Sequence, residues 1–173
     1  ELIARVRNLL ALRLSRRQLA DRAAWLADEV AKATATIAAR EKEAILRLSR
    51  AAEYRDPETG MHLLRMSNYT RIVAAGLGLP PGEQKQLMEA APMHDVGKVG
   101  TPDHILLKPG RLTPEEFEVM KQHATIGYEI LRDSVSQLLQ NAAVVALTHH
   151  EKFDGSGYPR GLAGEAIPLY GRI

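Results

Sequence analysis

The sequence predicts an all-α fold in which a long N-terminal helix leads into a helical bundle. Residues 1–56 contain neither glycine nor proline, whereas the rest of the chain holds all 13 glycines and all 9 prolines. Because these two residues are the main helix breakers, the first third should form one continuous helix. Beyond it, apolar residues recur with helical spacing, and no alternating strand pattern competes with them.

The long helix carries an apolar seam of the kind found in coiled coils. Alternating steps of three and four pick out thirteen positions, of which ten are apolar. They are Leu2, Arg5, Leu9, Leu12, Arg16, Leu19, Ala23, Leu26, Val30, Ala33, Ile37, Arg40 and Ala44. We expect residues 1–40 to form a stalk that pairs in a parallel homodimer. The alternative is an amphipathic helix packed on its own domain, because alanine and arginine weaken the seam.

The remainder, residues 41–173, is expected to be one helical domain. Pro80-Pro81-Gly82 and Lys108-Pro109-Gly110 interrupt the apolar pattern and should lie in connections. The helices expected between these breaks cover residues 61–77, 83–94, 114–132 and 136–150.

Composition narrows the class of function. Apolar residues make up 45% and charged residues 25% of the chain, which is ordinary for a globular protein. No membrane span or signal peptide is visible, so a cytoplasmic protein with no membrane partner is expected. Residues 1–50 carry 11 basic against 6 acidic residues, and residues 51–173 carry 12 against 15. The basic excess therefore lies on the stalk, and nucleic acid is not expected as a partner.

The histidines are the strongest chemical signal. All 6 lie between His62 and His150, and there is no cysteine, so any metal must be held by imidazole and carboxylate groups. Glu58 and His62 are four residues apart, which places both on one face of a helix, although a solvated pair would show the same spacing. His104 has no comparable neighbours and is expected to be a structural or surface residue.

A second set of candidates follows at the ends of the expected helices. His94-Asp95 is followed by Lys98, and such a carboxylate can bridge two cations, although a surface helix end with a capping lysine would look similar. His123 lies within a helix and is uninformative by itself. His149 and His150 are adjacent and point about 100° apart in a helix, so a broad, two-metal centre would explain both.

The segment after the last two histidines predicts a binding loop. Residues 151–160 read EKFDGSGYPR, and Gly155, Gly157 and Pro159 favour a tight, irregular turn. A plain surface connection is the alternative. Loops beside candidate ligands often carry function, which favours the binding loop.

Together these motifs resemble the HD-GYP family. The matching stretches are DPETGMH at 56–62, HDVGK at 94–98, His123, HH at 149–150 and DGSGYP at 154–159. The resemblance covers roughly residues 41–173. Residues 1–13, ELIARVRNLLALR, resemble the last helix of a response-regulator receiver domain and its linker.

The resemblance implies an HD-type helical bundle with two or three divalent metal ions, iron or manganese first, and nickel, cobalt or zinc as alternatives. It implies hydrolysis of cyclic di-GMP to pGpG, GMP or both, as the output module of a two-component response regulator. The implied catalytic residues are Asp95 and Lys98, and the implied substrate contacts are Lys98, Gly157, Tyr158 and Pro159. The implied metal ligands are Glu58, His62, His94, Asp95, His123, His149 and His150.

Two other functions stay open at this point. One is a catalytically silent cyclic-dinucleotide sensor or interaction module whose loop binds a partner such as a diguanylate cyclase. The other is a broader HD-type nucleotide phosphohydrolase, against which the GYP loop counts. The family also has a metal-ligand aspartate on a later helix, so the domain is expected to be C-terminally incomplete at Ile173.

Overall fold

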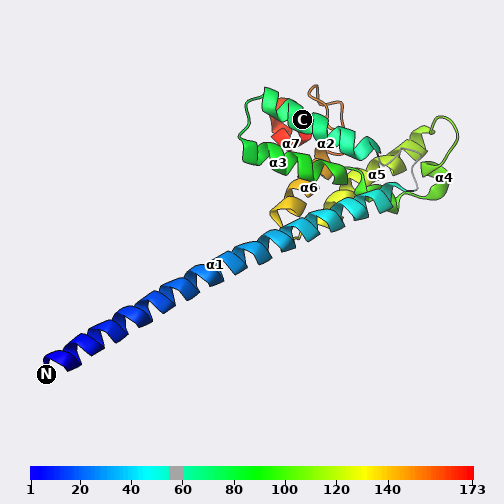
Figure 1. The fold of residues 1–173 in the computed structure, drawn as a ribbon. Coiled ribbons are helices and arrows are strands. Elements are labelled where there is room, and N and C mark those ends of the chain that lie inside the picture. The colour runs from blue at the N-terminus through cyan, green and yellow to red at the C-terminus, as the bar shows by residue number, and fades with distance from the viewer. Residues whose placement is uncertain (55–60) are drawn as a thin grey trace. The chain divides into compact units, whose positions relative to one another are not determined.

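The computed structural model describes residues 1–54 and 61–173, and every extended regular element among them is helical (Figure 1). The described part contains no β-strand, only one isolated bridge between Asp154 and Ala163. The all-α prediction is therefore confirmed. None of the described helices combines the length and apolarity that a membrane crossing requires.

The first helix, α1, runs without interruption over Leu2–Glu53, as the absence of glycine and proline predicted (Figure 1). The chain divides into two compact units, Glu1–Glu43 and Ala44–Ile173. Every residue of the first unit is exposed. In the second unit α1 buries Ile45, Ser49 and Glu53, which are spaced four apart and so share one helix face.

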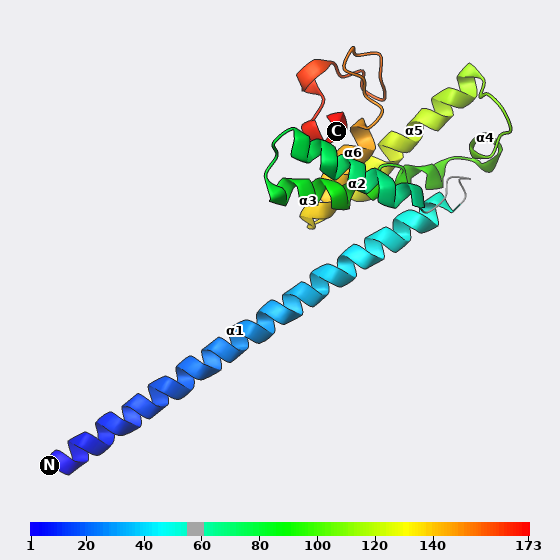
Figure 2. The same cartoon turned by 45° about the horizontal axis from the view of Figure 1, so that its top comes forward.

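In the described part of the second unit, α1 is followed by six further α-helices and three short 3₁₀ helices. The α-helices are α2 (Met61–Gly76), α3 (Pro81–Ala90), α4 (Asp103–Leu106), α5 (Pro114–Leu131), α6 (Gln137–Thr148) and α7 (Leu169–Arg172). The 3₁₀ helices are η1 (Ala91–Met93), η2 (Val96–Gly100) and η3 (Gly164–Ala166). Figure 2 shows α2, α3, α5 and α6 gathered in one bundle. Helix α6 packs against α3, α5 and α7, and α2 packs against α3.

The core forms where α6 meets its neighbours. Ala142, Ala143 and Ala146 of α6 are buried against Met93 and Leu131. Small side chains on α6 allow the surrounding helices to approach closely. The central helix that ends at the two adjacent histidines is thus held on several sides.

One expected helix is shorter in the structure. The sequence predicted a continuous helix over 83–94, but α3 ends at Ala90 and a 3₁₀ turn follows. Pro92 has no N–H with which to continue the α-helical ladder, so the backbone tightens there. As a result, His94 and Asp95 lie on a short irregular segment between η1 and η2 rather than on a helix.

Two glycines bring that segment against α5. A Cβ atom on Gly97 would lie 1.9 Å from the carbonyl oxygen of His123, and one on Gly127 would lie 3.3 Å from the nitrogen of Gly97. No larger residue fits at position 97 without moving the backbone. This close contact sets Asp95, two residues earlier, beside His123.

Candidate metal centre

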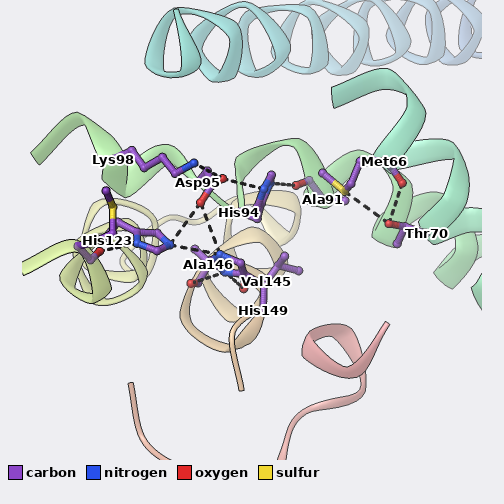
Figure 3. A network of polar contacts seen from close by, with 11 residues as sticks. Met66, Thr70, Ala91, His94, Asp95, Lys98, His123, Val145, Ala146 and His149 are labelled. Carbon is purple, nitrogen blue, oxygen red and sulfur yellow. Dashed lines mark hydrogen bonds and ion pairs between the residues drawn. The ribbon is translucent and has the colours of Figure 1, made fainter. Parts of the chain in front are cut away.

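Four candidate ligands from three parts of the chain converge in the second unit. Asp95 comes from the segment between the 3₁₀ helices, His123 from α5 and His149 from the end of α6 (Figure 3). His150 follows His149 directly. One ligand atom from each of the four lies within 4.8 Å of the others. The structure thus brings together residues that are up to 55 positions apart in sequence.

The carboxylate of Asp95 is the hub of this arrangement, and its two oxygens face different partners. Oδ2 lies 2.9 Å from Nε2 of His94 and 2.9 Å from Nζ of Lys98. Oδ1 lies 3.3 Å from Nε2 of His123 and 3.5 Å from Nε2 of His149. A carboxylate with one oxygen on each side is suited to bridge two cations.

Backbone carbonyls orient three of the imidazoles (Figure 3). Nδ1 of His94 lies 3.1 Å from the oxygen of Ala91, and Nδ1 of His123 lies 2.7 Å from the oxygen of Met120. Nδ1 of His149 likewise lies 3.0 Å from the oxygen of Ala146. A carbonyl oxygen only accepts, so each Nδ1 carries a proton and each Nε2 faces the centre, where a neutral ring offers a lone pair.

The centre has the chemistry of a cation site. Nε2 of His123 lies 3.3 Å from Nε2 of His149, and two such lone pairs repel each other unless a cation or a proton lies between them. Oδ1 of Asp95 is buried and accepts no hydrogen bond of good geometry. Imidazole and carboxylate ligands without sulfur suit divalent metals. These residues therefore fit divalent metal binding.

A second group of potential ligands shares Asp95. It consists of Glu53, His94 and Asp95, with one ligand atom from each again within 4.8 Å of the others. Sequence reasoning missed Glu53. Its spacing, four residues after Ser49 and eight after Ile45, places it on one face of α1, but only the structure shows that this face is buried.

Asp95 and His94 shift each other's pKa strongly. Burial alone would raise the pKa of Asp95, but its close contacts with His149 and His94 and the charge of Lys98 hold that pKa well below its usual value. Burial alone would lower the pKa of His94, yet its contacts with Asp95 raise it above the usual value. Asp95 is therefore an anion paired with Lys98, and it favours the protonated form of His94.

The imidazoles on the other side behave in the opposite way. Burial lowers the pKa of His123, which is only 1% exposed. Burial and the neighbouring His149 and His123 lower the pKa of His150 to about 3. These two rings are neutral near pH 7, and neutral imidazole is the form that binds a metal ion.

The GYP loop, residues 154–159, packs against His150 through an aromatic stack. The ring of Tyr158 stacks on that of His150 with centroids 4.5 Å apart, and its edge meets Phe117 of α5 at 5.9 Å. Nζ of Lys121 lies 5.1 Å from the Phe117 ring centre. Burial raises the pKa of Tyr158 to about 12, so its hydroxyl stays protonated.

A buried carboxylate that sequence reasoning did not single out holds the loop in place. Glu151 is 8% exposed and accepts one hydrogen bond of 2.8 Å from the N–H of Arg160 and another of 2.8 Å from the N–H of Leu162. Gly157 crosses directly over it, since a Cβ there would lie 2.5 Å from the Cα of Glu151. Glu151 directly follows His150, so one residue ties the loop to the end of α6.

The remaining predicted residues are distributed as follows. Lys98 contacts Asp95, and Pro159 follows Tyr158 through a cis peptide bond. His62 is half-buried in the first turn of α2 and belongs to neither ligand group found among residues 1–54 and 61–173. His104 is exposed on α4, as expected for a surface residue. Glu58 lies outside the described residues.

A cavity of about 480 Å³ adjoins the cluster. His94 and His149 form part of its wall, together with Tyr69, Phe153 and Arg172. A cavity of this size accommodates a small organic ligand beside the imidazoles. Its wall offers aromatic faces and one guanidinium group.

Comparisons with known proteins agree with this arrangement. Residues 13–173 match the family described as HD domain. A protein named cyclic di-GMP phosphodiesterase response regulator RpfG, from Xanthomonas campestris pv. campestris, is 49% identical over 173 residues, which is 100% of this chain and 46% of that protein. The cyclic di-GMP phosphodiesterase of Thermotoga maritima is 53% identical over 126 residues, covering 73% of this chain and 34% of that protein.

A third relative carries a different substrate in its name. The 3'3'-cGAMP-specific phosphodiesterase 2 of Vibrio cholerae is 47% identical over 132 residues, covering 76% of this chain and 25% of that protein. The chain thus spans less than half the length of each of these relatives. With the match to the HD domain over residues 13–173 and the DGSGYP loop packed on the histidine cluster, the chain belongs to the HD domain family and to its HD-GYP group.

Proposed function

We propose that this chain is the catalytic part of a metal-dependent phosphodiesterase that hydrolyses cyclic di-GMP to pGpG, GMP or both. The observation that carries the proposal is the position of Asp95, whose two oxygens face His94 on one side and His123 and His149 on the other. Hydrolysis adds one water across a phosphorus–oxygen bond: the water oxygen joins phosphorus, and the leaving 3′ oxygen takes up a proton.

The proposed metal ligands are His62, His94, Asp95, His123, His149 and His150, with Glu58 in a third site. Two or three divalent ions, iron or manganese first, would polarise the phosphate and make a bound water more acidic. Asp95 supplies negative charge to the centre, and its contacts hold the neighbouring imidazoles in position. The ordered Nδ1–carbonyl contacts keep each ring aimed inward before a ligand arrives.

Lys98 is proposed to contact the scissile phosphate. Its Nζ already lies 2.9 Å from Asp95, so a small side-chain rotation would bring it to a phosphate on the centre. A compact ammonium charge there would offset the negative charge that develops during attack. Gly157, Tyr158 and Pro159 are proposed to shape substrate access, because Tyr158 covers His150.

The test is turnover by the 173-residue chain, purified without oxygen and loaded with Mn²⁺ or Fe²⁺. Cyclic di-GMP and 3'3'-cGAMP are supplied separately, and products are separated by chromatography. We expect linear dinucleotide or mononucleotide from cyclic di-GMP, and no product after chelation or with Asp95→Asn. Binding of cyclic di-GMP without product from any metal form would instead support a silent sensor.

We further propose that α1 pairs with α1 of a second copy in a parallel dimer, and that the chain is the output module of a response regulator. The seam supports the dimer, since Leu9, Leu19 and Ile37 are between 62% and 68% exposed. The name of the Xanthomonas relative supports the regulatory context. A diguanylate cyclase is also proposed as a partner of the loop, where Phe153 is 69% exposed and offers an apolar contact. A pull-down that compares the unmodified chain with Phe153→Ser tests this.

A further inference from the structure

We infer that Glu53, in the last turn of α1, is a ligand of a second cation, which it shares with His94 and Oδ2 of Asp95. The inference rests on the proposed two-metal phosphodiesterase and adds a carboxylate to it. None of the sequence motifs contains Glu53. The long N-terminal helix would then end inside the metal centre rather than beside it.

The geometry is that of two ligand groups meeting at one carboxylate. His123, His149 and His150 gather on the Oδ1 side of Asp95, whereas His94 lies 2.9 Å from Oδ2. Ligand atoms of Glu53, His94 and Asp95 lie within 4.8 Å of one another. Ligands about 2.0 to 2.2 Å from an ion are up to about 4.4 Å apart, so only a small contraction is needed.

Burial and charge make Glu53 unusual for a helix residue. It is 7% exposed, whereas Glu41 and Glu43, both about three turns earlier on α1, are exposed. Glu53 and Asp95 are both buried beside His94, and a divalent cation between them would offset the cost of burying two carboxylates there.

The direct test counts bound Mn²⁺ in the full chain, without any nucleotide. Wild type, Glu53→Gln and the matched control Glu43→Gln are titrated and analysed by elemental analysis and electron paramagnetic resonance. We expect two coupled Mn²⁺ ions in wild type and in Glu43→Gln. In Glu53→Gln we expect one ion with a mononuclear spectrum, because the second ion has lost an anionic ligand. Two coupled ions of unchanged affinity in folded Glu53→Gln would overturn the inference.

A second variant covers the case in which Glu53→Gln does not fold. Glu53→Asp keeps the charge but withdraws the carboxylate by one methylene, so it should bind the second ion at least about tenfold more weakly than wild type. Unchanged affinity in this variant would also overturn the inference. Metal counting needs no substrate, so absence of cyclic di-GMP turnover with two ions bound would contradict the proposed function alone.

Discussion

Both compact units are helical, but their side chains differ in burial. In residues 1–43 every side chain is exposed, including the large apolar ones of the seam. In residues 44–173 helices of 10 to 18 residues bury side chains against one another. The helix of the first unit thus leaves its apolar seam available to the proposed dimer, whereas the second unit depends on packing within the chain. Changes in the second unit should act on the site, and changes in the first should act only on association.

The largest effect should follow from the residue shared by both ligand groups. Asp95→Asn removes the negative charge to which His94 and Lys98 are paired and the carboxylate between the two groups. We expect loss of most bound metal and a fall in phosphodiesterase rate of more than about 100-fold, the upper end for changes around a metal centre. Metal content and initial rates measure this. Retention of both ions would contradict the role of Asp95, and Asp133→Asn serves as an exposed control.

A smaller effect is expected from loosening the GYP loop. Glu151→Ala leaves the N–H groups of Arg160 and Leu162 without their acceptor. We expect a loss of roughly 2 to 4 kcal/mol in the free energy of unfolding, since both bonds are made to a charged, buried group. Urea unfolding compares this variant with Glu165→Ala, which changes an exposed glutamate. An equal, small change in both would show that the loop does not depend on Glu151.

The metal-free protein should lose stability in mild acid through His150. Its pKa is about 3 in the folded state against an ordinary 6.5, so the unfolded chain binds a proton that the folded chain refuses. The contribution is present above pH 6.5 and is lost as the pH falls toward 3. His94 has a raised pKa, so its contribution to stability increases as the pH falls. That contribution is present in both the wild type and His150→Gln and does not affect the comparison.

Thermal unfolding of the wild type and of His150→Gln at pH 7.5 and pH 5 isolates the contribution of His150. Between these two pH values, the melting temperature of wild type should fall by roughly 5 °C more than that of His150→Gln. Parallel curves would mean that His150 titrates normally in the folded protein.

The smallest effect should come from the stalk. Arg16 occupies the apolar seam, and Arg16→Leu would add an apolar side chain to the proposed dimer contact. We expect a dimer about tenfold tighter, with unchanged rate per subunit, because a buried leucine contributes at least about 1 kcal/mol. Light scattering over a range of concentrations measures it, with Arg17→Leu beside the seam as control. A monomer at every concentration for both variants would end the dimer proposal.

Much of the fold could be predicted because its signals are local. The long helix follows from the absence of breakers, and α2, α5 and α6 follow from apolar spacing between glycine and proline pairs. The convergence of Asp95 and the histidines was implied by the family motifs. The end of α3 at Ala90 was also readable, since Pro92 is a local signal that the expected helix over 83–94 passed over.

The missed parts depend on tertiary contacts. Glu151 acts by accepting bonds from residues 9 and 11 positions later, and nothing in its neighbours shows where that loop returns. Glu53 becomes notable only once the face of α1 carrying Ile45 and Ser49 is known to be covered. Gly97 is a similar case, because its need for a bare Cα arises from the carbonyl of His123 on another helix.

Histidines on the two sides of Asp95 have pKa values shifted in opposite directions. Metal binding on the two sides should therefore release different numbers of protons. His123 and His150 are already neutral near pH 7, so a cation entering on their side displaces almost no protons. The pKa of His94 is raised by Asp95, so a cation on its side displaces more protons than one on the other side. The heat of metal binding, measured by calorimetry in buffers of different ionisation enthalpy, therefore distinguishes binding on one side of Asp95 from binding on the other. As the medium becomes more acidic, the His94 side is the first to empty.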